Sequence, residues 1–259
     1  DSGILFNATR IRHQLMTKDT LQFRFALAKF PDIIRLQDGI EIQDALETAF
    51  REVGREETAC IVRSNKRANQ YNQQIRKTIL SHENKVCVGD LLMITKNNYF
   101  WTSPDSEIPF LANGDIIQIL EIFSIKELYG FEFAEVKIKM VDYIDQPTFD
   151  TVIILNTLDL DTPSLSYEQS NLLYNEVQND YIKIKSKYQR FLKTKENPFF
   201  NALQVKFSYA ITCHKAQGGQ WPVVFIEKPY LKDGSNIDYL RWLYTAVTRA
   251  ESKLYLIGF

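Results

Sequence analysis

The sequence predicts an α/β fold in which helices flank a parallel sheet, with a small β-barrel inserted into it. Two patterns favour this fold. Short apolar strands alternate with amphipathic helices toward both ends of the chain. Between residues 85 and 155, strand-like runs follow one another without a convincing helix. We therefore expect residues 1–84 and 161–259 to form one α/β domain, which a barrel at residues 85–160 interrupts.

The first α/β segment is expected to alternate strands and helices. Its apolar run at residues 59–62 is typical of a parallel strand, because helices cover both faces of such a strand. Ser64 or Asn65 can cap the helix that follows, and Gly54 ends the helix before it. The expected elements are a helix over 4–15, a strand over 32–36, a helix over 42–53, a strand over 59–62 and a helix over 65–79.

The barrel is predicted from five short strand-like runs separated by turn residues. Gly89-Asp90 and Asn113-Gly114-Asp115 are examples of such turns. The five runs are residues 86–88, 91–94, 116–120, 133–140 and 152–155.

The second α/β segment begins with a helix-favouring stretch at residues 166–195, which Pro198 ends. Its apolar side chains recur at helical spacing: Leu172, Leu173, Val177, Tyr181, Ile184 and Tyr188. The elements expected after it are a strand over 205–211, a strand over 223–226, a helix over 237–250 and a strand over 254–257.

The composition is that of a globular protein, with 259 residues of which 45% are hydrophobic and 24% charged. No apolar run approaches the roughly 20 residues that span a bilayer, and we expect a cytoplasmic protein. Three cysteines (Cys60, Cys87, Cys213) lie in apolar contexts and lack metal-type spacing, so we expect reduced thiols and no metal site. Because the chain begins at Asp1 without methionine, we also expect a part of a longer protein.

The net charge of −1 hides two basic stretches. Residues 58–82 contain five basic residues and no acidic one, and residues 183–195 contain six, again without an acid. Each stretch is either a solvated helix face or a contact surface for a polyanion.

The loop at residues 212–220 joins two predicted strands and therefore lies at the carboxyl end of a strand, where open α/β sheets bind ligands. It contains Thr212, His214, Lys215 and Gln217, and Gly218 and Gly219 allow a ligand to approach the backbone closely. The alternative is a polar turn with a solvated lysine.

Arg249 is expected near the end of the last helix, beside Thr245 and Thr248. An arginine there could reach a γ-phosphate, because a planar cation with five donors stabilises the charge that develops in phosphoryl transfer. The alternatives are that Arg249 offsets the helix dipole or pairs with Glu251.

The two stretches together resemble motifs of the superfamily 1 DNA helicases, in the RecD/Pif1/Dda-like group that includes the exodeoxyribonuclease V alpha subunit. "AITCHKAQGGQWPVV" is similar to motif V and "LYTAVTRA" to motif VI. "ACIVRSNKRANQYNQQIR" resembles the start of the second RecA-like domain, and "GDLLMITKNNY" with "LANGDIIQI" resembles its inserted SH3-like barrel. "SGILFNATRIR" is similar to the stretch after motif IV. Only residues 166–195 lie outside the resemblance.

This resemblance implies the second half of a two-domain, ATP-dependent motor. The chain has neither a phosphate-binding loop nor the acidic magnesium motif. The cradle for ATP and Mg²⁺ is therefore expected in an N-terminal RecA-like domain of the parent chain, and the fragment alone is expected to be inactive. Arg249 would be the arginine finger, and Gln217, Gly218 and Gln220 would bind nucleotide. Many relatives carry glutamate at the position of Gln220, so this contact departs from the family pattern.

The resemblance also implies single-stranded DNA as a partner, with 5′ to 3′ travel. Thr212, His214 and Lys215 would connect the residues that contact DNA with those that contact the nucleotide. Arg63 and Asn65, with Lys66 and Arg67 in support, would contact phosphates at a strand-to-helix turn. In the barrel, Asn98 would contact DNA beside the aromatic run 99–101, whose alternative role is core or hairpin packing. The barrel could instead act as a pin or a brace. The parent either acts alone or joins nuclease and helicase subunits, as in a RecBCD-like complex; roles in DNA repair and recombination follow from the resemblance.

Two other classes of function stay open from the residues alone. The first is a stand-alone nucleic-acid-binding module whose motor motifs are vestigial. The second is a nucleotide-dependent metabolic enzyme, which is less favoured because no acid/base pair or activated nucleophile is visible, and because His13, His82 and His214 lie in unrelated contexts.

Overall fold

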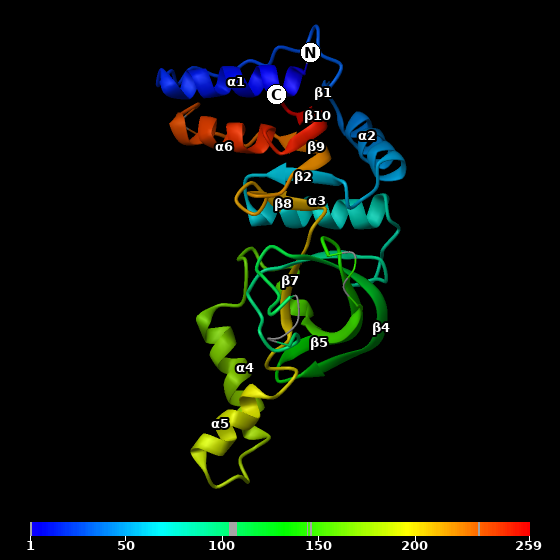
Figure 1. The fold of residues 1–259 in the computed structure, drawn as a ribbon, viewed down its shortest axis with the longest axis vertical. Helices are drawn as coiled ribbons and strands as arrows, with labels where there is room; N and C mark the ends of the chain where they lie inside the picture. The colour runs from blue at the N-terminus through cyan, green and yellow to red at the C-terminus, as the bar shows by residue number, and fades with distance from the viewer. Residues whose placement is uncertain (1, 104–107, 144, 146, 233) are drawn as a thin grey trace. The chain divides into compact units, whose positions relative to one another are not determined.

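The chain folds into two units in a computed structural model, one built on a parallel sheet and one on a closed barrel (Figure 1). The sheet unit comprises Asp1–Ser81 and Tyr209–Phe259, and the barrel unit comprises His82–Ser208. The structure describes residues 2–103, 108–143, 145, 147–232 and 234–259, so Asp1 lies outside the described residues. Among the described helices, none has the length and the apolar character that a bilayer crossing requires.

Five parallel strands form the sheet of the first unit, in the order β1-β10-β9-β2-β8. All five residues of β2 are buried, as expected for a strand with helices on both faces. The predicted parallel sheet is confirmed. The strands are β1 (Ile33–Leu36), β2 (Thr58–Val62), β8 (Ala210–Thr212), β9 (Trp221–Glu227) and β10 (Ala250–Ile257).

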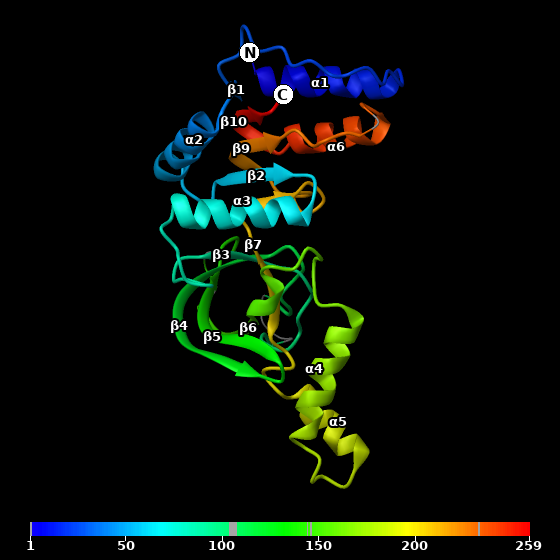
Figure 2. The same ribbon diagram turned by 180° about the vertical axis from the view of Figure 1, so that it is seen from behind.

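Four helices flank this sheet: α1 (Gly3–Met16), α2 (Gly39–Glu52), α3 (Asn65–Thr78) and α6 (Ile237–Val247). Helices α1 and α6 pack against each other and against β10, and they run side by side in Figure 1 and Figure 2. Helix α3 packs on β2 and β8. Ser2, Asp38, Ser64 and Asn236 each accept a hydrogen bond from a backbone N–H of the first turn, so an N-cap begins every one of these helices.

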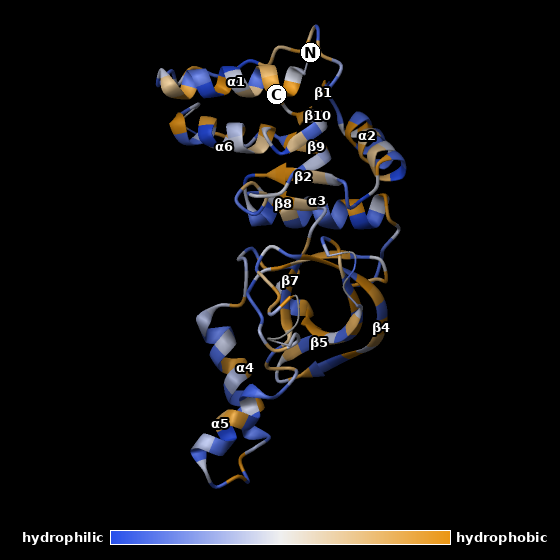
Figure 3. Cartoon of the chain, in the orientation of Figure 1, coloured by the Kyte–Doolittle hydropathy of each residue, from blue (hydrophilic) through white to orange (hydrophobic). Residues whose placement is uncertain are grey.

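The second unit contains a closed barrel of five strands in the order β3-β4-β5-β6-β7, which confirms the predicted barrel. Its strands are β3 (Leu91–Ile94), β4 (Ile116–Leu128), β5 (Phe131–Met140), β6 (Phe149–Ile154) and β7 (Leu203–Phe207). Neighbours are antiparallel except β6 and β7, which run parallel. The strands of both units are largely hydrophobic in Figure 3.

The fifth barrel strand is not the one that the sequence predicted. Residues 86–88 form no strand; they lead into a turn in which Asp90 Oδ2 accepts from the backbone N–H of Cys87 at 2.8 Å. The barrel is closed instead by β7, because the expected strand over 205–211 divides into β7 and β8. Residues of β7 alternate between buried and half-buried, as one face of a barrel requires, whereas β8 belongs to the parallel sheet.

The helical stretch at residues 166–195 also differs from the expectation. It forms two helices, α4 (Tyr167–Asn179) and α5 (Lys187–Lys195), because Ser186 caps a new helix by accepting from Gln189 N at 3.3 Å. A 3-10 turn, η1 (Leu155–Thr157), precedes them. Leu173 and Val177 of α4 pack in a cluster with Phe133 of β5, so the helices belong to the barrel unit and not to the α/β segment expected at 161–259.

Candidate functional site

The loop between β8 and β9, residues 213–220, leaves the sheet at the carboxyl ends of its strands. Strands β8 and β2 are parallel neighbours, with Thr212 opposite Val62. The first loop residue continues this pairing, because Cys213 N donates to Val62 O at 3.2 Å. Arg63 and Cys213 therefore follow neighbouring strand ends, and both lie at the edge where open α/β sheets bind ligands.

The loop, which we call the glycine loop, folds as consecutive tight turns. Lys215 N and Ala216 N donate to Thr212 O at 2.9 and 3.0 Å, and Gly219 N donates to Ala216 O at 3.2 Å. Gly218 has a φ of +90°, which disfavours any residue with a Cβ. A Cβ on Gly219 would lie 2.6 Å from the ring of Trp221. Both glycines are thus required by the geometry of the loop.

Arg249, between α6 and β10, is bonded directly to the glycine loop. Its Nη1 donates to Gly219 O at 2.9 Å, its Nε to Thr245 O at 3.1 Å and its Nη2 to Thr248 Oγ1 at 3.2 Å. The backbone continues the connection, since Trp221 N donates to Arg249 O at 2.9 Å. The structure thus brings the motif V-like and motif VI-like stretches into one site.

The acceptors of Arg249 are all neutral. Among the described residues, no carboxylate pairs with this guanidinium, so pairing with Glu251 is not seen. The alternative that Arg249 offsets the helix dipole is partly right, because the Thr245 carbonyl that accepts from its Nε belongs to the last turn of α6. The positive charge of Arg249 is therefore held in place without being neutralised.

Cys213 lies close to both Arg249 and Arg63. Burial raises the pKa of its thiol to about 11, while the charges of Arg249 and Arg63 act in the opposite direction. Its Sγ lies 3.5 Å from Trp242 O, and the Arg63 guanidinium carbon lies 6.0 Å from the centre of the Trp242 ring. The charges of Arg63 and Arg249 thus both act on this buried thiol.

The other residues of the glycine loop differ in exposure. His214, Gln217, Gly218 and Gln220 are exposed. The Nε2 of Gln220 lies 3.4 Å from Thr248 O, a long hydrogen bond. Thr212 and Lys215 are half-buried, and burial lowers the pKa of the Lys215 ammonium. The loop therefore presents amide and imidazole groups to solvent and keeps its lysine partly covered.

The turn from β2 to α3 carries Arg63, Asn65 and Lys66. Ser64 is the N-cap and accepts from Arg67 N at 3.2 Å. Arg63 and Lys66 are exposed, and in the described part of the chain neither forms an ion pair. No acidic residue lies in the first turn of α3. Because a helix N-terminus is itself electropositive, this turn favours a phosphate or another anion.

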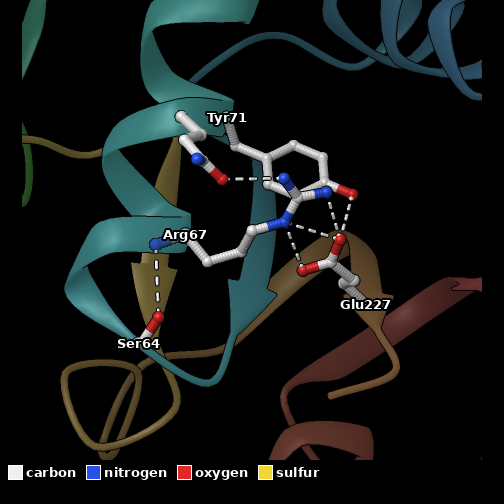
Figure 4. Close-up of polar contacts among 5 residues, drawn as sticks. Ser64, Arg67, Tyr71 and Glu227 are labelled. Atoms are coloured by element: carbon white, nitrogen blue, oxygen red, sulfur yellow. Dashed lines mark hydrogen bonds and ion pairs between the residues drawn. The ribbon is translucent and has the colours of Figure 1, made fainter. Parts of the chain in front are cut away.

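The sequence suggested Arg67 as a supporting phosphate contact, and in the structure its guanidinium is bonded within the fold (Figure 4). Its Nε lies 2.8 Å from both carboxylate oxygens of Glu227, and its Nη1 donates to Gln70 Oε1 at 2.8 Å. Tyr71 OH donates to the same carboxylate at 3.1 Å. The hydrogen bond to Glu227 raises the pKa of Arg67. The side chain therefore ties α3 to the end of β9.

Asn72 is a supporting residue that the sequence analysis missed. It is buried, donates from Nδ2 to Ala210 O at 2.9 Å and accepts at Oδ1 from Ala210 N at 2.7 Å. These two bonds hold the edge strand β8 just before the glycine loop. The available signal was a polar residue between Ala68 and Ile75 on the apolar stripe of α3.

Asn98 in the barrel unit has both ends of its amide occupied. Its Nδ2 donates to Asn201 O at 2.8 Å, and its Oδ1 accepts from Phe100 N at 3.0 Å. Trp101 is half-buried and also donates to Asn201 O, so its role is packing. Tyr99 remains 66% exposed and lines a groove of about 380 Å³ with Phe100. The groove thus offers aromatic faces rather than the Asn98 amide.

One group of possible metal ligands lies in the barrel unit. Ligand atoms of His82, Cys87 and Asp90 all lie within 4.8 Å of one another. However, Asp90 Oδ1 already lies 2.8 Å from His82 Nδ1, and Oδ2 accepts from Cys87 N. Both carboxylate oxygens therefore stabilise the turn, and we assign the cluster a structural role.

The segment that carries the glycine loop and Arg249 is similar to a known protein family. Residues 207–257 match the family model of the UvrD-like helicase C-terminal domain. This segment resembles a helicase C-terminal domain. The match contains both the glycine loop and Arg249, and over this segment it agrees with the resemblance to superfamily 1 helicases. No curated protein sequence matches the chain.

Solved helicase structures are similar to the chain over almost its whole length. The Pif1 helicase from Candida albicans has a TM-score of 0.36 and 11% identity, over 99% of this chain and 53% of that one. The Pif1 helicase from Bacteroides, in complex with ADP-AlF3 and ssDNA, has a TM-score of 0.45 and 11% identity, over 100% of this chain and 49% of that one. The chain spans about half the length of these helicases.

Proposed function

We propose that this chain is the C-terminal motor half of an ATP-dependent, RecD-like DNA helicase, within a longer protein. The observation that carries the proposal is the un-neutralised guanidinium of Arg249, bonded to Gly219 of the glycine loop at the carboxyl edge of a parallel sheet. The match of residues 207–257 to a helicase C-terminal domain supports it.

Arg249 is suited to act as the arginine finger. Three of the five guanidinium N–H groups are used in hydrogen bonds, which leaves two for a phosphate oxygen. Held in this way, the side chain loses little entropy when it meets the transferring phosphoryl group. The exposed Gln217, Gly218 and Gln220 lie on the same loop and would contact the nucleotide beside it.

The residues described here fit one wall of a nucleotide site and not a complete one. They supply a cation and amides, while the sequence contains no phosphate-binding loop and no acidic magnesium motif. We therefore assign the cradle for ATP and Mg²⁺ to an N-terminal RecA-like domain, and we expect this chain alone to hydrolyse no ATP. The magnesium ion would neutralise phosphate charge in that domain.

The DNA grip is proposed at the turn from β2 to α3. Arg63 and Lys66 are exposed cations without carboxylate partners in the described chain, and Asn65 lies between them at a helix N-terminus. Thr212, His214 and Lys215 begin the loop at the same sheet edge, and Gly219 at its other end holds Arg249. One short loop thus connects the proposed DNA contacts to the proposed nucleotide contact. Membership of a RecBCD-like complex stays a prediction from the resemblance.

Strand separation by the longer protein tests this function. With ATP, a duplex that carries a 5′ single-stranded tail should be unwound, and Arg249→Ala should abolish unwinding while the protein still binds the tail. A protein that binds the tail but never separates the strands would refute the helicase assignment and favour a nucleic-acid-binding module.

A further inference from the structure

Helix α5 of the barrel unit exposes its large apolar side chains to solvent. Tyr188, Phe191 and Leu192 share one face, yet they are 69%, 41% and 39% exposed. Among the residues of α5, Thr194 is buried instead, and its Oγ1 donates to Arg190 O at 2.9 Å. A surface helix normally turns its apolar face toward the core. The outer face of α5 is therefore an unpartnered surface.

The same surface is strongly basic. Six basic residues and no acidic one lie between residues 183 and 195. Within the described chain, only Lys193 of the six has a carboxylate partner, in an exposed pair with Glu196 at 2.7 Å. Asp180, at the other end of the stretch, accepts from Tyr129 OH. The α5 surface (Lys183, Lys185, Lys187, Tyr188, Phe191, Leu192 and Lys195) thus combines aromatic faces with uncompensated cations.

Lys195 connects this surface to the aromatic groove of the barrel. Its Nζ lies 5.7 Å from the centre of the Phe191 ring and 4.9 Å from that of Phe200. Lys195 and Phe200 also line the groove that contains Tyr99 and Phe100. The α5 surface and the groove are therefore continuous within one unit.

We propose that the α5 surface binds single-stranded nucleic acid, with bases stacked on Tyr188 and Phe191 and phosphates beside the lysines. This inference rests on the proposed function, to which it adds a second strand contact outside the sheet unit. Stacked bases cover aromatic faces while the attached phosphates compensate the lysines. An apolar protein segment would cover the aromatic faces and leave the lysines without counter-charges, so nucleic acid fits the surface better.

Binding of a fluorescent oligothymidylate to the 259-residue chain tests the proposal, measured by anisotropy over a range of salt concentrations. Tyr188→Ala with Phe191→Ala should weaken binding at least about 5-fold. Lys183→Gln with Lys185→Gln and Lys187→Gln should lower the salt slope by about 0.7 for each phosphate contact that is lost. Tyr167→Ala is the matched control, because Tyr167 is also an exposed aromatic residue, 78% against 69% for Tyr188, but lies on α4; the affinity of this variant should be unchanged.

Three outcomes overturn the proposal. Unchanged affinity and salt slope in the α5 variants, together with weakened binding by Arg63→Gln, would refute the α5 contact and leave the proposed function intact. No salt-dependent binding by the unmodified chain would refute both. If the α5 variants instead lose self-association in sedimentation, or lose binding to an acidic peptide, with DNA affinity unchanged, the surface is a protein interface. Circular dichroism of the exposed-site variants should match that of the unmodified chain.

Discussion

Arg249 and Gly219 are joined by a hydrogen bond of 2.9 Å from the guanidinium Nη1 to the carbonyl oxygen. The bond connects the end of α6 to the glycine loop, and the backbone bond from Trp221 N to Arg249 O lies beside it. A change in the loop therefore moves the guanidinium. The glycine loop and Arg249 therefore form one site.

Replacing Gly219 by alanine should disturb the site through packing. The added Cβ would lie 2.6 Å from the Trp221 ring, so the loop or the ring must move, at a cost of about 1–3 kcal/mol in unfolding free energy. Urea unfolding measures the loss in unfolding free energy. ATP turnover of the longer protein measures whether the site is disturbed. The matched control is Gly39→Ala, where no atom lies within 4 Å of the new Cβ and stability should be retained. Equal stability of the two variants would contradict the account.

Lys66 and Arg67 are adjacent cations that should behave differently. Lys66→Gln should lower the salt slope of single-strand binding by about 0.7, because an exposed phosphate contact is lost. Arg67→Gln should leave the slope unchanged and lower stability by about 1–2 kcal/mol, because it breaks the bonds to Glu227. Salt titrations and urea unfolding of both variants distinguish the two roles. If Arg67→Gln lowered the salt slope of single-strand binding as much as Lys66→Gln does, the Arg67–Glu227 ion pair would have to break when DNA binds.

Cys213 should make the chain less stable as the pH rises from about 9 to about 11. Burial raises the pKa of its thiol from 9.0 to about 11, so between these values the folded state binds more protons than the unfolded state. The stabilisation is complete below pH 9 and is lost as pH rises through 11. The free energy of unfolding should therefore fall less steeply between pH 9 and pH 11 in Cys213→Ala than in the unmodified chain, as urea unfolding at a series of pH values would measure. If the free energy of unfolding fell equally with pH in both proteins, the burial of this thiol beside Arg63 and Arg249 would be contradicted.

The sequence predicted those parts of the fold whose signals are local. A continuous apolar run identified β2 as a parallel strand, residues 223–226 were predicted as the strand that became β9, and Ser64 was one of two residues expected to cap α3. The position of the glycine loop then followed from the strands on either side of it. The helix predicted over 237–250 added Arg249 near its end, and the structure shows the contact of this residue with the loop.

Features that depend on long-range pairing were not predictable in this way. The choice of β7 over residues 86–88 as the fifth barrel strand depends on pairing with β3 and β6, which lie far from it in the chain. Likewise, the amide of Asn98 and the guanidinium of Arg67 look available in the sequence. Their partners, Asn201 and Glu227, are distant residues that only folding brings close.

The central claim is that Arg249 acts on the nucleotide while Arg63 and its neighbours hold DNA. ATP turnover of the longer protein at saturating single-stranded DNA tests it most directly. Arg249→Ala should lower turnover on the order of 10³-fold or more, with the dissociation constant for DNA unchanged. Arg63→Gln is the control, and it should weaken DNA binding while turnover at saturating DNA is largely retained. Near-normal turnover in Arg249→Ala would contradict the account.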